Sequence, residues 1–194
     1  MLNISGITLT FNQPSEINGA PIGTLLQVGS NNQKTGYSLQ TIYFPTAKPT
    51  DAIKTGSDAA VCGDCMGKWG DPASDKSVIP FMTEYRRCLG YTHQWEKPQH
   101  QDLLPGCMAS VDDPEEYSRA NDMGWRTFRT KLESDPLLPN EIICPYPKVQ
   151  CVDCGMCDGK DSKFKKNIVV NVHGVRYKVN RYKGYRTQLE LPVV

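Results

Sequence analysis

Four cysteines fall within residues 144–157, in the sequence CPYPKVQCVDCGMC. They are Cys144, Cys151, Cys154 and Cys157, with the spacing C-x6-C-x2-C-x2-C. Two residues between cysteines let a tight turn aim both sulfurs, and nearby backbone N–H groups, at one ion. The spacing therefore predicts that the four thiols converge on one metal site.

The spacing leaves the metal open. Cys151 and Cys154, followed by Gly155, resemble a zinc knuckle, in which glycine permits the backbone turn after the second thiolate. The run of Cys151, Cys154 and Cys157 also resembles the start of a bacterial ferredoxin run. Because thiolate sites accept either cofactor, zinc and an iron–sulfur cluster both fit.

A second cysteine pair, Cys62 and Cys65, lies far upstream. These two could share a second site with Cys88 and Cys107, or complete the C-terminal site. A CxxC pair is also found in redox proteins, but the strand–helix–strand context of a thioredoxin motif is missing here. Metal ligation is the interpretation that we favour for Cys62 and Cys65.

A chain of 194 residues can bury a core without disulfides, so its eight cysteines do not indicate a secreted disulfide scaffold. The first residues lack a basic region followed by an apolar run, and no segment approaches about 20 apolar residues. These features predict reduced cysteines, a cytoplasmic protein and no contact with a membrane.

Positive charge is concentrated near the C-terminus. The net charge of the chain is +1, but residues 160–186 carry nine Lys and Arg against the single acid Asp161. The segment predicts either an anionic partner, namely nucleic acid or a host protein, or an edge strand that cationic side chains protect. The candidate phosphate contacts are Lys165, Lys166, Arg176, Lys178, Arg181 and Lys183. Three tyrosines would be free to stack on bases: Tyr177, Tyr182 and Tyr185.

The pattern of apolar and turn residues predicts a β-rich first segment, with strands near residues 4–11, 25–28 and 37–44. Helices are expected over 50–60 and 79–88. Further strands are expected over 89–95, 107–111, 125–130, 141–144 and 167–173, the last turning at His173 and Gly174 into a basic hairpin.

One helix has clear boundaries. Asp113 is a good N-cap, Glu116 completes a capping box, and Gly124 ends the helix. Because it joins two predicted strands within about 25 residues, the pattern predicts a parallel strand–helix–strand unit. Its buried face should carry Tyr117, Ala120 and Met123.

A candidate ligand crevice follows from the predicted strand over 89–95, where Tyr91, His93 and Trp95 would share one face. At the end of a parallel strand such residues would face the usual crevice, although an aromatic core face is the alternative. Arg126 and Arg129 would point to opposite faces of a later strand. One of them, taken as Arg129, could reach an anion beside Tyr91 and His93.

Several motifs occur in order along the chain: VCGDC (61–65), WGDPAS (69–74), LGYTHQW (89–95), MASVDD (108–113), GWRTFRT (124–130), EIICP (141–145), CVDCGMCDG (151–159) and VVNVHG (169–174). This series resembles a family of cysteine-rich proteins encoded by bacteriophages and mobile elements. That family is distantly similar to the barrel domains of radical S-adenosylmethionine enzymes. The chain has CxxCxxC in place of their CxxxCxxC motif, which argues against radical catalysis.

The expected fold is α/β, an incomplete or irregular (βα) barrel-like sheet with a β-rich N-terminal segment and a C-terminal β-hairpin. We expect one structural domain, comprising the β-rich segment 1–60, a metal-binding core 61–174 and a basic tail 175–194. The leading hypothesis for function is a viral, phage-type metal-binding accessory protein that contacts nucleic acid or a host protein. A cluster-dependent enzyme and a metal-stabilised virion or assembly component are the alternatives.

Overall fold

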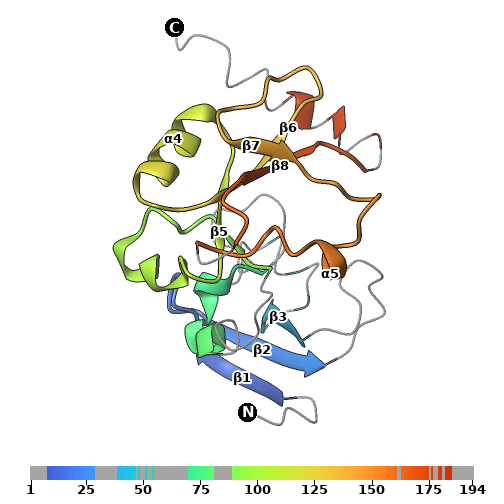
Figure 1. The fold of residues 1–194 in the computed structure, drawn as a ribbon. Helices are drawn as coiled ribbons and strands as arrows, with labels where there is room; N and C mark the ends of the chain where they lie inside the picture. The colour runs from blue at the N-terminus through green and yellow to red at the C-terminus, as the bar shows by residue number, and fades with distance from the viewer. Residues whose placement is uncertain are drawn as a thin grey trace, which may run out of the picture.

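The computed structural model describes residues 8–28, 39–46, 70–80, 89–160 and 163–174, together with 48, 51, 54, 176, 179–180 and 182–184. Two sheets organise these residues (Figure 1). One is antiparallel and three-stranded, and the other is parallel and five-stranded. The α/β class predicted from the sequence is therefore confirmed.

The N-terminal sheet consists of β1 (Thr8–Pro14), β2 (Pro21–Val28) and β3 (Leu39–Pro45), paired in that order. Its strands confirm the predicted β-rich segment. The pairing of β1 with β2 shifts register between Thr10 and Gln13, where Asn12 has a φ of 58°. Such a bulge explains the break in the alternation of apolar residues along this strand.

The parallel sheet contains β4 (Tyr91–Thr92), β5 (Met108–Val111), β6 (Thr127–Lys131), β7 (Glu141–Ile143) and β8 (Asn167–Asn171). Its order is β4-β5-β6-β8-β7, and each neighbouring pair is parallel. Among the described strands β4 and β7 are the edges, so this sheet is open and no closed barrel is formed. Five strands are too few to close the usual eight-stranded barrel.

The helix α4 (Pro114–Asp122) confirms the predicted parallel unit, because it joins the parallel strands β5 and β6. The Asp113 carboxylate accepts a 2.8 Å hydrogen bond from the Glu116 backbone N–H, and Gly124 follows the helix with a φ of 86°. Tyr117 and Ala120 are buried as expected. Met123 is 41% exposed, so its predicted burial is wrong.

The main core lies between α4, β5 and the loops that precede β5. Its buried members are Ala73, Trp95, Leu103, Cys107, Ala109, Val111, Tyr117, Ala120 and Trp125. Both tryptophans keep a polar partner: Trp95 Nε1 donates to the Ser110 carbonyl, and Trp125 Nε1 donates to Gln101 Oε1. Three short 3-10 helices support this core: η1 (Pro72–Ser74), η2 (Lys76–Val78) and η3 (Pro98–Leu103).

Two predicted strands differ from the structure. The strand expected over 89–95 is reduced to β4, because the chain turns after Thr92, whose Oγ1 accepts from the Gln94 backbone N–H at 2.9 Å. The C-terminal hairpin is also wrong: residues 176, 179–180 and 182–184 are helical. Since β6 and β7 already occupy both edges of β8, no edge remains there for a hairpin partner. The predicted helices over 50–60 and 79–88 lie outside the described residues, except for helical residues 51, 54, 79 and 80.

Removing the α4 cap should have a moderate effect. We expect Asp113→Ala to lower the free energy of unfolding by about 1 kcal/mol, because the Glu116 N–H loses its acceptor. Asp122→Ala, at the last residue of the helix, is the matched control and should cause no loss. Urea unfolding followed by circular dichroism measures both, and equal losses in the two variants would contradict the assigned cap.

Candidate metal centre

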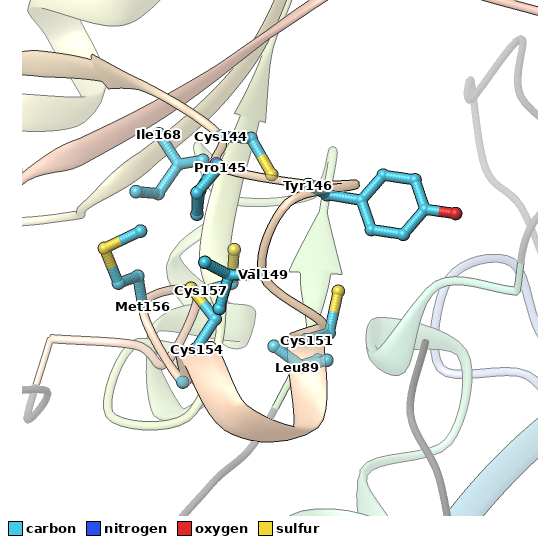
Figure 2. Close-up of a pocket in the computed structure, with 11 residues that line it drawn as sticks. Leu89, Cys144, Pro145, Tyr146, Val149, Cys151, Cys154, Met156, Cys157 and Ile168 are labelled. Atoms are coloured by element: carbon cyan, nitrogen blue, oxygen red, sulfur yellow. The ribbon is translucent and has the colours of Figure 1, made fainter. Parts of the chain in front are cut away.

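One pocket collects all four C-terminal cysteines (Figure 2). Cys144 follows β7, and its backbone N–H donates to the Val169 carbonyl at 2.8 Å, which continues the pairing of β7 with β8. Cys151 and Cys154 begin and end the short helix α5 (Cys151–Cys154), and Cys157 follows it. Gly155 ends α5 with a φ of 62°, a conformation that glycine adopts without strain. The local turn therefore presents three thiols, and the end of a strand presents the fourth.

The remaining walls of this pocket are apolar or aromatic. The empty volume is about 300 Å³, including space that opens to solvent. The side chains and backbone that line it beside the cysteines are Leu89, Pro145, Tyr146, Val149, Gly155, Met156 and Ile168. Among the described residues that line the pocket there is no histidine or carboxylate, so the cysteine sulfurs are the metal-binding groups that these residues offer.

The four thiols do not form a ready-made shell for a single ion. Within the described part of the chain, no three His, Cys, Asp or Glu side chains are grouped so that they could hold one metal ion. Figure 2 shows Cys144 and Cys151 on different sides of the space that they share with Cys154 and Cys157. The cysteines thus surround a pocket instead of closing on a point.

The pocket disfavours the charged, thiolate form of Cys157 when no cation is nearby. Burial raises the pKa of Cys157 from 9.0 to about 11, and nearby Cys144, Cys151 and Cys154 raise it further as like charges. The hydroxyl of Tyr91 acts in the opposite direction, because it hydrogen-bonds the Cys157 sulfur. Without a cation, Cys157 is therefore a protonated thiol at neutral pH. A bound metal would invert this preference, since a coordinating thiol is deprotonated.

Tyr91 does not line this pocket, but its hydroxyl contacts the pocket residue Cys157. Its ring packs on Phe128 with centroids 4.4 Å apart, and burial, followed by the neighbouring Cys157, raises its pKa well above 10.0. His93 has other neighbours: its backbone N–H donates to the Asp71 carboxylate, and its Nε2 lies 3.9 Å from Asp112 Oδ2. The sequence had placed Tyr91 and His93 together on a strand face, whereas the turn after β4 gives them different partners.

Arg129, the third predicted crevice residue, is 2% exposed and forms a buried ion pair. Its Nε and one terminal nitrogen donate to the two carboxylate oxygens of Glu141 at 2.8 and 2.7 Å. The predicted role in substrate binding finds no support in this geometry, because the guanidinium is already paired. Its partner lies on β7, beyond β8 in the sheet, and strand order was not predictable from the sequence.

Arg126 is the residue that the sequence analysis undervalued. It is buried, and its guanidinium donates to the carbonyls of Met156, Asp158, Gly159 and Lys166. The Met156 and Asp158 carbonyls lie directly before and after Cys157, so the Arg126 side chain holds the backbone on both sides of this cysteine. No local pattern in the sequence signals this role, because the partners are 30 to 40 positions away.

The loop that follows Cys157 is also packed against the main core. A Cβ at Gly159 would collide with the backbone of Pro105 and Cys107, and the Lys160 N–H donates to the Leu104 carbonyl at 3.0 Å. Glycine is thus required at position 159 by close backbone approach. Cys107 is fully buried in the main core and does not line the cysteine pocket. Cys62, Cys65 and Cys88 lie outside the described residues.

The Lys and Arg side chains of the basic segment are exposed where the structure describes them. Lys165, Lys166, Arg176 and Lys183 are all exposed, whereas Lys178 and Arg181 lie outside the described residues. Tyr182 is half-buried, and its hydroxyl donates to the Thr130 carbonyl at 2.7 Å. This contact ties Tyr182 to β6, so it does not have the freedom to stack on bases that the sequence suggested. Tyr177 and Tyr185 are outside the described residues.

His100 was missed by sequence reasoning, which had no motif to single out a histidine in a polar segment. It is fully buried, and neither ring nitrogen has a hydrogen-bond partner among the described residues. Burial, and then the Lys76 ammonium, lower the pKa of His100 below 6.5, while Asp71, Glu16 and Asp102 oppose the shift. The folded protein therefore holds this imidazole neutral.

This burial predicts a pH dependence of stability. The unfolded chain takes up a proton at His100 below about pH 6.5, and the folded chain does so only at lower pH, so stability is lost as pH falls through that interval. We expect His100→Phe to reduce the slope by at most about 1.4 kcal/mol per pH unit. Urea unfolding between about pH 7 and 5, on either side of the ordinary histidine pKa, measures the slope of the unfolding free energy against pH. His173 is exposed, so His173→Gln serves as the control and should retain the wild-type slope. Identical slopes in all three proteins would contradict the assignment.

Comparison of the chain with family models, curated proteins and solved structures finds no match. The structure contains, within its described residues, no helix that is long and apolar enough to cross a membrane.

Proposed function

We propose that this chain is a thiolate metal-binding protein, with Cys144, Cys151, Cys154 and Cys157 as ligands. The observation that carries the proposal is the shared pocket: Cys144, directly after β7, and the three cysteines of α5 and the loop that follows it bring four sulfurs to one apolar space. A bound metal ion would balance the negative charge of four neighbouring thiolates in this apolar pocket.

The surroundings of the four half-buried cysteines favour metal binding over four free thiols. Tyr91 already donates a hydrogen bond to Cys157, an interaction that favours the anionic sulfur. Arg126 places a buried positive charge on the same loop and holds its carbonyls in position. Outer partners of this kind orient ligands and tune bound metals in known sites. The accessory role in a bacteriophage, implied by the family resemblance, is part of this proposal.

Elemental analysis of the purified protein tests the site. We expect a stoichiometric metal in the wild type, which Cys154→Ser should largely lose. Asp153→Asn lies in the same α5 turn and does not line the pocket, so it should keep the metal. Chelation should lower the free energy of unfolding by several kcal/mol, because metal binding contributes to folding. Wild-type protein without stoichiometric zinc or iron would refute the proposal.

A second candidate function, nucleic-acid binding, is favoured by the exposed cationic residues that directly follow the cysteine loop. Lys160, Lys163, Lys165 and Lys166 are all exposed. Phosphate contacts release counterions, so affinity should fall steeply with salt. We expect the double variant Lys165→Ala, Lys166→Ala to flatten the slope of log K against log [salt] by about 1 to 2, and Lys54→Ala to leave it unchanged. Absence of affinity for single- or double-stranded nucleic acid at low salt would refute this role and leave a host protein as the partner.

A further inference from the structure

We infer that the cysteine pocket takes an iron–sulfur cluster, with Cys144, Cys151, Cys154 and Cys157 each ligating iron, and not a single zinc ion. The inference rests on the proposed function, since it specifies which metal group the proposed thiolate site binds. Three features of the pocket carry it: the arrangement of the sulfurs, the composition of the walls and the hydrogen bond from Tyr91.

The arrangement of the sulfurs fits a group with its own volume. A tetrahedral zinc site with Zn–S bonds of about 2.3 Å requires its sulfurs to lie roughly 3.8 Å from one another. No three of the described cysteines are grouped for a single ion, yet all four line one pocket that opens to solvent. In an iron–sulfur cluster the four thiolates bind two or four different irons, so the ligands surround the cluster and do not converge on one ion.

The order of the ligands agrees with this arrangement. Cys151, Cys154 and Cys157 form a C-x2-C-x2-C run, and the structure places all three on one turn and the loop that follows it. The fourth ligand, Cys144, comes from the end of a strand and is followed by Pro145. Three closely spaced cysteines with a more distant Cys-Pro is the ligand pattern of ferredoxin-type clusters.

The walls suit a cluster for a separate reason. Leu89, Val149, Met156 and Ile168 cover the pocket with apolar groups, and none of the described residues that line it is a histidine or a carboxylate. Apolar walls limit solvent access, which controls the potential of such centres. The Tyr91 hydroxyl adds a hydrogen bond to Cys157, and hydrogen bonds to sulfur are a further determinant of cluster potential.

The test is anaerobic purification of the full chain, followed by assays of iron, acid-labile sulfide and zinc and by a visible spectrum. We expect iron and sulfide in equal amounts, a brown protein with broad visible absorption, and loss of both in Cys154→Ser but not in Asp153→Asn. Stoichiometric zinc without sulfide would overturn the cluster and leave the thiolate metal site intact. Absence of any metal, also after reconstitution with iron and sulfide, would overturn both.

A second readout tests the position of the cluster. Tyr91→Phe should keep the iron content and shift the midpoint potential to more negative values, because the lost hydrogen bond stabilised the reduced cluster. Tyr146→Phe is the matched control, since Tyr146 lines the pocket but Figure 2 shows its hydroxyl pointing away from the sulfurs. Equal potentials in wild type and Tyr91→Phe, or a metal centre without redox activity, would overturn the assignment.

Discussion

Arg126→Met is expected to lower the free energy of unfolding by about 3 to 5 kcal/mol, because it strips four carbonyls of their donor. The carbonyls belong to Met156, Asp158, Gly159 and Lys166, and the guanidinium is buried among them. Lysine lacks the planar fork that reaches several acceptors, so Arg126→Lys should recover little of this loss. Urea unfolding followed by tryptophan fluorescence measures the effect.

The matched control for this substitution is Arg119→Met. Arg119 donates to the Glu96 carboxylate at 2.9 Å, but both side chains are about half exposed, so water replaces the interaction readily. We expect little change in stability there. If Arg126→Met were no more destabilising than Arg119→Met, Arg126 would not hold the cysteine loop. Loss of metal from Arg126→Met at temperatures where the protein stays folded would show that the loop geometry serves the site.

Breaking the buried ion pair between Arg129 and Glu141 should lower the free energy of unfolding by about as much as Arg126→Met does. We expect Glu141→Leu to cost about 3 to 5 kcal/mol, because it leaves the Arg129 guanidinium buried without its carboxylate. The Leu138 backbone N–H, which donates to the same carboxylate at 2.7 Å, also loses its acceptor. The expected result is a lower urea midpoint with an unchanged denaturant slope.

A double-mutant cycle separates the pair from its surroundings. Arg129→Met combined with Glu141→Leu should be considerably more stable than Glu141→Leu alone, since no charge is then left buried. If the loss of unfolding free energy in the double variant equalled the sum of the losses in the two single variants, the two side chains would not be directly paired. Retention of metal in the double variant is expected as well, because neither residue lines the cysteine pocket.

Local sequence patterns were sufficient to predict part of the fold. The helix α4 was predictable because its cap, its buried stripe and its terminal glycine all lie within residues 113–124. The strands β2, β3, β5 and β8 were predictable from short apolar runs. Predictions failed where a segment depended on neighbours distant in sequence, as at β4, which is shortened by a turn, and after β8, whose edges are both taken.

The sequence alone determined the cysteine spacing, the capped helix and the alternation of strands and helices, because each depends on residues within about one element of one another. Only the tertiary structure decided the strand order β4-β5-β6-β8-β7 and, with it, the role of the buried charges. Arg126 and Arg129 look alike in the sequence, yet one holds the loop after Cys157 and the other pairs with Glu141. The physical reason is that a charge can be buried only where distant segments supply its partners, and those partners exist only once the chain has folded.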